Sequence, residues 1–180
     1  MKTNFDFLLK EPQFEPFAEA AISAERVLHI SPALCATACR TALEFAVKWL
    51  YSIDSSLTKP YADKLVTLIS TEDFQDLIPS GMAAKINYLR KIGNNATHNP
   101  KSVNKDQAVL ALENLHSFLD FLACCYADSY AETSFDKGII NKVVLLLLPF
   151  VVRTVLLRKL GAEYLGLSSL FTSVLQVLNM

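Results

Sequence analysis

Apolar residues recur at three- and four-residue spacing through most of residues 1–130, which is the period of a helix with one buried side. A first helix is predicted to begin near Pro16, because Phe17 and Ala21 then share one face. A second is predicted after Ser31, whose hydroxyl can cap a helix that has proline in its first position. The apolar face of this second helix is expected to contain Leu34, Ala38, Ala42, Phe45, Val47, Trp49 and Leu50.

The same spacing predicts shorter helices over 61–69, 70–78 and 79–93, with Ser70 or Thr71 as a cap for the middle one. No alternation of apolar and polar residues is long enough for a sheet, and no glycine-rich phosphate loop occurs. The sequence therefore predicts an all-α fold, a helical bundle.

The longest amphipathic stretch covers 104–131. His116 lies beside its apolar stripe and is expected at the boundary between core and surface. The residues predicted to be buried in this helix are Val109, Leu112, Leu115, Leu119, Leu122 and Ala123.

The stretch LRKIGNNATHNP concentrates polar residues at the end of a predicted helix. Glycine and asparagine tolerate the backbone conformation that ends a helix, so Gly93 is expected to stop it. If the helix instead continues, Asn94 and His98 share one face and form a polar notch toward another helix. Arg40 and Glu44 are then the natural partners, because a buried amide or imidazole needs hydrogen bonds. The plainer interpretation of Arg40 and Glu44 is a solvated ion-pair ladder with the lysine one turn later.

Composition and charge narrow the class of protein. With 52% hydrophobic and 19% charged residues over 180 positions, the chain can form one domain of ordinary size with an appendage. The net charge is −1, and acidic residues outnumber basic ones in 1–135, whereas the reverse holds in 136–180. The first part is therefore no general polyanion binder, since phosphate contacts need concentrated positive charge, and any nucleic-acid contact would be local.

Four cysteines bear on compartment and metals. Cys35 and Cys39 are one helical turn apart, and Cys124 and Cys125 are adjacent. This is not the framework of a secreted disulfide-rich domain, and no cleavable signal peptide precedes it, so a reduced, cytosolic setting is expected. Two cysteines on one helix face could belong to a metal site, but buried free thiols are the commoner explanation. We expect no metal and no other cofactor.

Three separated segments resemble a known family: MKTNFDFLLKEPQFEPFAEAA, CRTALEFAVKWL and INYLRKIGNNATH. They agree in order and spacing with a bacterial helical domain of unknown function. That domain is found at the N-terminus of type I restriction enzyme R subunits, the motor and nuclease subunits, and in stand-alone proteins. The resemblance covers roughly residues 1–130. It implies a role in DNA restriction or another form of phage defence.

This family in turn resembles the HEPN superfamily of helical nucleotide- and RNA-associated domains. Many of those domains carry an Arg-Asn pair followed by a histidine, used for metal-independent RNA cleavage. Here Asn94 and His98 match the asparagine and the histidine, but Gly93 stands where the arginine would be. Arg90 or Arg40 would have to replace it, since otherwise no cation stabilises charge on a scissile phosphate. The resemblance favours a non-catalytic binding or assembly module, with a ribonuclease as the alternative and a structural polar network as the plainest interpretation.

The composition changes after a polar linker at 131–138. Residues 139–157 reach the length of a bilayer span only by including Arg153, which is costly in a membrane unless it faces a cavity or a partner. Residues 139–180 resemble the first membrane helix, the loop and the start of the second helix of polysaccharide flippases, which implies that Arg153 faces a central cavity. A gene fusion or truncation and a small membrane-anchored protein both account for this junction. The third explanation is that residues 139–180 pack as ordinary core helices of the protein.

These inferences define three segments: an all-α, HEPN-like bundle at 1–130, a linker at 131–138, and a hydrophobic, membrane-inserted helical hairpin at 139–180. Nucleic acid or restriction-system subunits are the expected partners, with membrane contact through 139–180 and homo-oligomerisation left open. The head would be cytoplasmic. The candidate binding residues are Arg40, Glu44, Arg90, Asn94 and His98. Under the ribonuclease alternative the catalytic candidates are His98, Asn94 and Arg90.

Overall fold

The computed structural model describes residues 2–140, and every regular element named within them is a helix, which confirms the all-α prediction for this part. Residues 2–136 belong to one compact unit, and a second unit begins at Lys137. The described α-helices of the first unit are α1 (Glu15–Val27), α2 (Pro32–Ile53), α3 (Leu65–Leu68), α4 (Glu72–Leu77), α5 (Met82–His98) and α6 (Lys105–Tyr126). Short 3₁₀ helices are η1 (Asp6–Lys10), η2 (Pro12–Phe14) and η3 (Pro100–Ser102).

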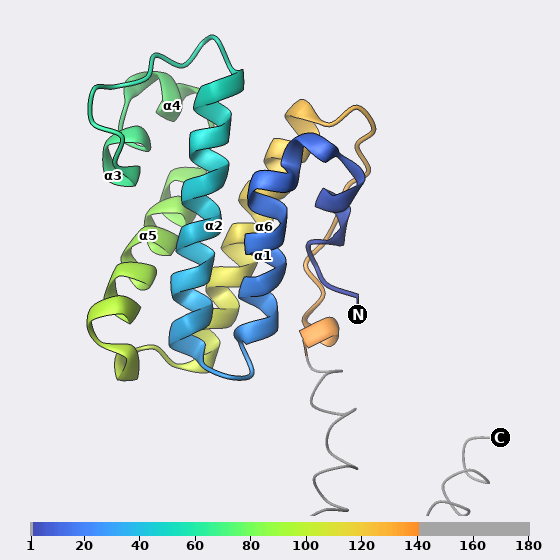
Figure 1. Cartoon of the computed structure of the whole chain (residues 1–180), viewed down its shortest axis with the longest axis vertical. Helices are drawn as coiled ribbons and strands as arrows, with labels where there is room; N and C mark the ends of the chain where they lie inside the picture. Colours follow the sequence, from blue (N-terminus) through green and yellow to red (C-terminus); the bar gives the residue numbers. More distant parts are fainter. Residues whose placement is uncertain (1, 141–180) are drawn as a thin grey trace, which may run out of the picture. The chain divides into compact units, whose positions relative to one another are not determined.

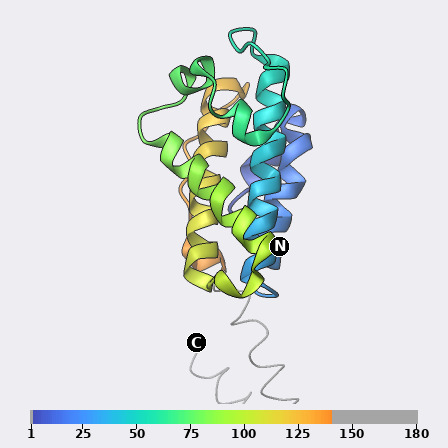
Figure 2. The ribbon, with the colours of Figure 1, turned by 90° about the vertical axis from the view of Figure 1, so that its left-hand side faces the viewer.

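The four longer helices, α1, α2, α5 and α6, form the bundle, and α3 and α4 lie at one end of it (Figure 1). α2 is central and contacts the other three, and α5 lies across one side (Figure 2). The buried positions of α2 are mostly small, including Ala36, Ala42 and Ala46, so its neighbours can approach closely. The largest side chains of the core come from several elements and include Phe5, Phe14, Phe17, Phe74 and Phe118.

Capping side chains account for where three helices begin. Ser31 accepts a hydrogen bond from the backbone three residues later and precedes a proline, as predicted. Of the two candidates for α4, Thr71 is the cap, whereas Ser70 donates to carbonyls of the preceding turn. α6 begins with a capping box: the backbone N–H of Gln107 donates to Asn104 Oδ1 at 2.9 Å, and that of Asn104 donates to Gln107 Oε1 at 3.0 Å.

The predicted helix end at Gly93 is wrong. α5 continues through Gly93 and ends at His98, so the alternative that places Asn94 and His98 on one helix face applies. The physical reason is that Gly93 is buried against α2, where it permits close packing instead of ending the helix. The left-handed glycine among the described residues is Gly81, at the start of α5. The helix predicted over 61–69 is also too long, because α3 has a single turn.

Several burial predictions are corrected as well. Leu34 and Phe45 are 55% and 45% exposed, because α2 turns its small residues inward and leaves these larger ones outside. Val109 is only half-buried. His116 is not a boundary residue but only 3% exposed. The rings that surround it come from outside its own helix, so the periodicity of α6 could not reveal them: Phe5, Phe7 and Phe135.

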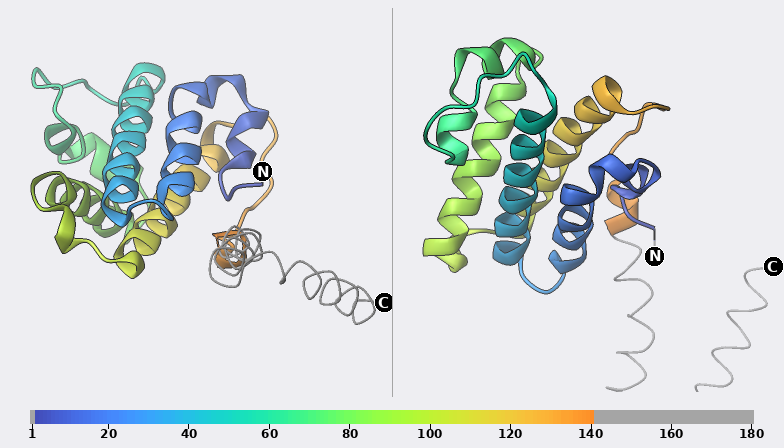
Figure 3. Two further views of the ribbon diagram at one scale, coloured as in Figure 1. Left: turned by 60° about the horizontal axis from the view of Figure 1, so that its bottom comes forward. Right: turned by 45° about the horizontal axis from the view of Figure 1, so that its top comes forward.

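The N-terminal arm and the segment after α6 lie side by side along the bundle (Figure 3). Asn4 Nδ2 donates to the carbonyl of Asp136 at 3.3 Å, and the backbone N–H of Asp136 donates to Asn4 Oδ1 at 2.7 Å. Thr133 donates to Asp120 of α6 at 2.6 Å. Thr133 and Asp136, from the predicted linker at 131–138, are therefore hydrogen-bonded to other parts of the first unit.

The predicted hydrophobic hairpin lies almost wholly outside the described residues, as does Arg153, so its membrane insertion stays a prediction. Within residues 2–140, one helix, α6, is long and apolar enough to cross a membrane. More than half of its apolar stretch is buried inside the bundle. Core packing therefore explains the apolar character of α6.

Candidate binding site

A pocket of about 250 Å³ lies between α2, α5 and residues 63–66, which end the loop before α3 and begin that helix. Arg40 and Glu44 are one turn apart on α2, and Arg90 and Asn94 are one turn apart on α5, so each helix presents two polar side chains to the same space. The structure thus brings four of the predicted binding residues together. The complete lining is Arg40, Glu44, Asp63, Lys64, Leu65, Val66, Arg90 and Asn94.

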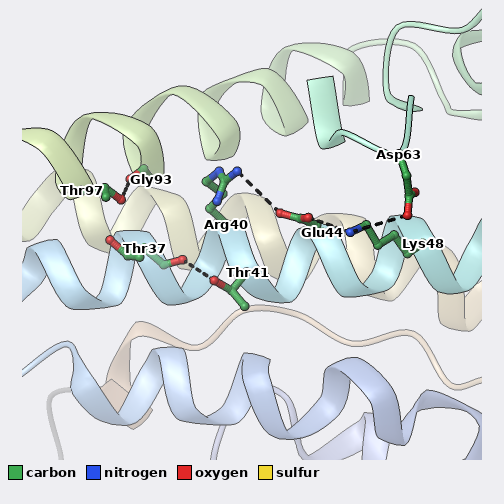
Figure 4. Close-up of polar contacts among 8 residues, drawn as sticks. All are labelled: Thr37, Arg40, Thr41, Glu44, Lys48, Asp63, Gly93 and Thr97. Carbon is green, nitrogen blue, oxygen red and sulfur yellow. Dashed lines mark hydrogen bonds and ion pairs between the residues drawn. The ribbon is translucent and has the colours of Figure 1, made fainter. Parts of the chain in front are cut away.

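Gly93 determines how closely α5 approaches α2 at this pocket. A Cβ placed on Gly93 would overlap Arg40 Cβ, and it would lie 2.9 Å from Arg40 Cδ and 3.0 Å from the carbonyl oxygen of Ala36. The side chain of Arg40 rises from α2 toward α5, and its guanidinium lies between the two helices (Figure 4). An arginine at position 93, which the HEPN pattern would require, does not fit this packing. The guanidinium at this contact therefore comes from α2.

The carboxylates of the pocket are shared among several cations. Glu44 Oε2 is 3.5 Å from Arg40 Nη2, and Glu44 Oε1 is 2.9 Å from Lys48 Nζ. Asp63 lies 4.0 Å from Lys48 Nζ and 3.6 Å from Lys59 Nζ. The hydrogen bond to Glu44 raises the pKa of Lys48. The ladder predicted along α2 is present and extends to the loop before α3 (Figure 4). Such partly exposed pairs contribute about 0.2–1 kcal/mol each, so they orient the side chains more than they stabilise the fold.

Some cationic groups of the pocket have no partner of opposite charge or no hydrogen-bond acceptor. Among residues 2–140, no carboxylate lies within ion-pair distance of Arg90 or Lys64. The Nε atoms of Arg40 and Arg90 are both buried and have no hydrogen-bond acceptor among the described residues. A buried donor left unpaired costs about 1–3 kcal/mol, and more when it is charged. Because both arginines line the pocket, oxygen atoms placed there could supply the missing acceptors once the guanidinium groups turn toward them.

The remaining predicted residues are placed differently. Asn94 is exposed at the rim of the pocket, whereas His98, one turn farther along α5, is exposed and is not part of the lining. The polar bond that does form at this end of α5 is from Thr97 Oγ1 to the carbonyl of Gly93, at 3.0 Å. The predicted amide–imidazole notch is therefore divided: its amide faces the pocket, and its imidazole is in solvent.

Sequence reasoning does not find residues 63–66, at the start of α3 and just before it. Asp63 and Lys64 add charge to the pocket, and Leu65 and Val66 form its apolar side. Their stretch had been predicted as part of an ordinary helix over 61–69, and it contains no motif that points to a site. Only the return of this loop to α2, shown by the contact of Asp63 with Lys48, places it at the pocket.

The cysteines show no comparable arrangement. Cys35 and Cys39 are free and buried, and burial, with a further contribution from Cys35, raises the pKa of the Cys39 thiol well above its ordinary value. Such thiols are poor nucleophiles and metal ligands. Cys124 and Cys125 are free and exposed. Within residues 2–140, no group of three or more His, Cys, Asp or Glu side chains is placed to hold a metal ion.

Comparisons with known proteins give one family. Residues 23–141 match the model of the family described as Domain of unknown function (DUF4145), which is more than half of the chain. No curated protein matches the chain, and no solved structure matches it. The matched residues include α2, α5 and the whole lining of the pocket. The chain therefore belongs to the Domain of unknown function (DUF4145) family.

Proposed function

We propose that the helical unit is a non-catalytic binding and assembly module whose ligand site is the pocket between α2 and α5. The observation that carries this proposal is the convergence of Arg40 and Arg90 on one small pocket, each with a buried and unpaired Nε. If these arginines served only as a solvated surface, their Nε donors would be expected to contact water, because burying a donor without a partner is costly. A ligand with several oxygen atoms removes that cost.

The position of His98 supports binding without bond cleavage. A general base must come within hydrogen-bond reach of the proton that it abstracts. His98 is exposed and lies outside the lining, whereas the cations gather around Arg40 and Arg90. The pocket thus has groups that hold an acidic ligand and no imidazole beside them.

For the biological setting we propose DNA restriction or another form of phage defence, which is supported by the resemblance of the three quoted segments to the domain at the N-terminus of restriction-enzyme R subunits. Its partner would be a nucleic acid or a subunit of such a system that presents an acidic group to the pocket. Acidic residues outnumber basic ones in 1–135, so a long polyanion is repelled elsewhere on the unit. The contact is therefore local and specific to the pocket.

Co-purification tests this role directly. The tagged full-length chain would be isolated from its native cells as wild type, as Arg90→Glu and as Lys91→Glu. Lys91 is the matched control, because it is exposed on the same helix and does not line the pocket. We expect the same nucleic acid or protein to accompany the wild type and Lys91→Glu, and to be lost from Arg90→Glu. Identical recovery with all three forms would refute the pocket as the binding site.

The competing function is a HEPN-type ribonuclease. One observation favours it: Arg40 places a guanidinium beside Gly93, where the catalytic arginine of the HEPN pattern is missing. Cleavage of mixed RNA by the wild-type chain and by His98→Ala separates the two functions. We expect no cleavage by either form. Activity that is present in the wild type and disappears in His98→Ala would overturn the non-catalytic proposal.

A further inference from the structure

We infer that the pocket between α2 and α5 binds a phosphate group, either as inorganic phosphate or at the end of a phosphate monoester. This inference deepens the proposed binding function and rests on it, since it names the chemical class of the ligand. Three features lead to it: the surplus of positive charge at the pocket, the unpaired guanidinium donors, and the size of the cavity.

Positive charge exceeds negative charge around the pocket. Glu44 and Asp63 are the carboxylates of the lining, and both already have cationic partners. Glu44 pairs with Arg40 and Lys48, and Asp63 pairs with Lys48 and Lys59, which do not line the pocket. The lining cations left without a carboxylate among the described residues are Lys64 and Arg90. A phosphate monoester carries about −1.5 to −2 at pH 7, which matches two unpaired cations, whereas a carboxylate carries a single charge.

The donors also suit phosphate geometry. A guanidinium presents a rigid fork of N–H groups that engages two oxygens of one phosphate. Arg40 and Arg90 approach from different helices, so their forks can engage different oxygens of one tetrahedral group. Glu44 contacts Nη2 of Arg40, so the Nε of Arg40 stays unpaired. The Nε of Arg90 is unpaired as well. Lys64 adds a point charge, and the amide of Asn94 adds a neutral donor at the rim.

The size of the pocket limits the ligand. Pockets for drug-sized molecules have volumes of about 300–1,000 Å³. The cavity here has a volume of about 250 Å³, so it suits one small anionic group and excludes a large heterocycle from its interior. Any larger molecule that carries the phosphate must therefore extend out of the pocket past its exposed lining residues, Asp63, Lys64, Val66 and Asn94.

Isothermal titration calorimetry of the full-length chain tests the inference with four small ligands: inorganic phosphate, ribose 5-phosphate, ribose and acetate. We expect both phosphates to bind, and neither ribose nor acetate to bind measurably at the same concentrations. Tighter binding of inorganic phosphate identifies the free ion as the ligand, and tighter binding of ribose 5-phosphate identifies an ester; both support the inference. Acetate that binds as tightly as phosphate, or phosphate that does not bind, overturns it.

Variants connect the binding to the pocket. Arg90→Gln should weaken phosphate binding at least tenfold, about 1.4 kcal/mol, and Arg90→Lys should recover part of the loss, because it restores the charge but not the fork. Lys64→Gln should also weaken phosphate binding. Because Lys64 is exposed and tolerates substitution, this variant tests the site even if Arg90→Gln folds poorly. Lys91→Gln removes one charge from α5 outside the pocket and should leave the affinity unchanged. Equal affinities for Lys64→Gln and Lys91→Gln would contradict the assignment.

The two proposals can fail separately. If phosphate does not bind but partner recovery still depends on Arg90, the binding module is retained and the phosphate assignment is wrong. If phosphate binds at Arg90 and Lys64 but no partner depends on Arg90, the phosphate site is retained and the assembly role is wrong.

Discussion

Substitution of Gly93 by alanine tests how the pocket is built. Gly93 lies inside α5, where glycine is less favourable than alanine by about 0.8–1.0 kcal/mol. On helix propensity alone, Gly93→Ala should stabilise the protein. The packing predicts the opposite, because the new Cβ would overlap Arg40 Cβ and would lie 3.0 Å from the carbonyl oxygen of Ala36.

The steric cost should exceed the propensity gain. Arg40 Cβ and the Ala36 carbonyl are fixed to the backbone of α2, so the clash is relieved only if the helices move apart. Overpacking of this kind costs about 1–3 kcal/mol and can cost more. Because the overlapping Arg40 Cβ cannot rotate away, the cost belongs to the upper part of this range, about 2–3 kcal/mol. After the propensity gain is subtracted, a net loss of about 1–2 kcal/mol is expected. At about 3–5 °C per kcal/mol for a unit of this size, Tm should fall by about 3–10 °C.

Thermal unfolding followed by circular dichroism measures this change. Asn95→Ala is the matched control, because Asn95 is the second residue after Gly93 on the same helix and is exposed. The control gains helix propensity without a clash, so its Tm should equal or slightly exceed that of the wild type. Gly93→Ala should also weaken phosphate binding, since it displaces Arg40. A Tm for Gly93→Ala at or above the wild-type value would refute the close-packing explanation.

Three further predictions concern other parts of the molecule. Burial lowers the pKa of His116, although nearby Asp120 acts in the opposite direction. The stability contributed by the neutral ring is therefore complete above the ordinary pKa of histidine, about 6.5. It is lost as the pH falls through the lowered pKa of the folded state. Urea unfolding should therefore show a loss between pH 7.5 and 5.5 that is smaller in His116→Gln, and an equal loss would contradict this. Asn104→Ala removes the capping box of α6 and should lower the free energy of unfolding by about 1 kcal/mol; an unchanged urea midpoint would show that the cap is dispensable. Finally, the intact chain should fractionate with membranes and residues 1–135 alone should not, whereas recovery of both in the supernatant would refute the membrane hypothesis for 139–180.

Much of the bundle could be predicted from local chemistry. Ser31 and the proline after it mark the start of α2, and helical periodicity identifies α1, α2 and α6. These signals depend on neighbours within one helix, so a sequence displays them directly. Gly93 shows where such signals fail: the same glycine can end a helix or admit a neighbouring helix, and only the position of Arg40 decides between them.

The candidate site was predictable in part for the same reason. Helical spacing singles out Arg40 with Glu44 and Asn94 with His98, whereas Arg90 enters as a substitute for the arginine of the HEPN pattern. Four of these residues share a pocket, and His98 does not line it. The contribution of Lys64 depends on the path of a loop and left no local pattern. His116 is a similar case, since its burial results from rings of the N-terminal arm and of the segment after α6.

The most direct test of the pocket is to observe the unpaired arginine nitrogens themselves. Nitrogen-15 NMR of the full-length chain would follow the Nε–Hε resonances of Arg40 and Arg90 during a phosphate titration, with each assigned by its loss in an Arg→Lys variant. Arg26, exposed on α1, is the internal control. We predict that both pocket resonances shift and saturate together while that of Arg26 stays in place. Resonances of Arg40 and Arg90 that do not move, or that move no more than that of Arg26, would contradict the existence of an anion site between α2 and α5.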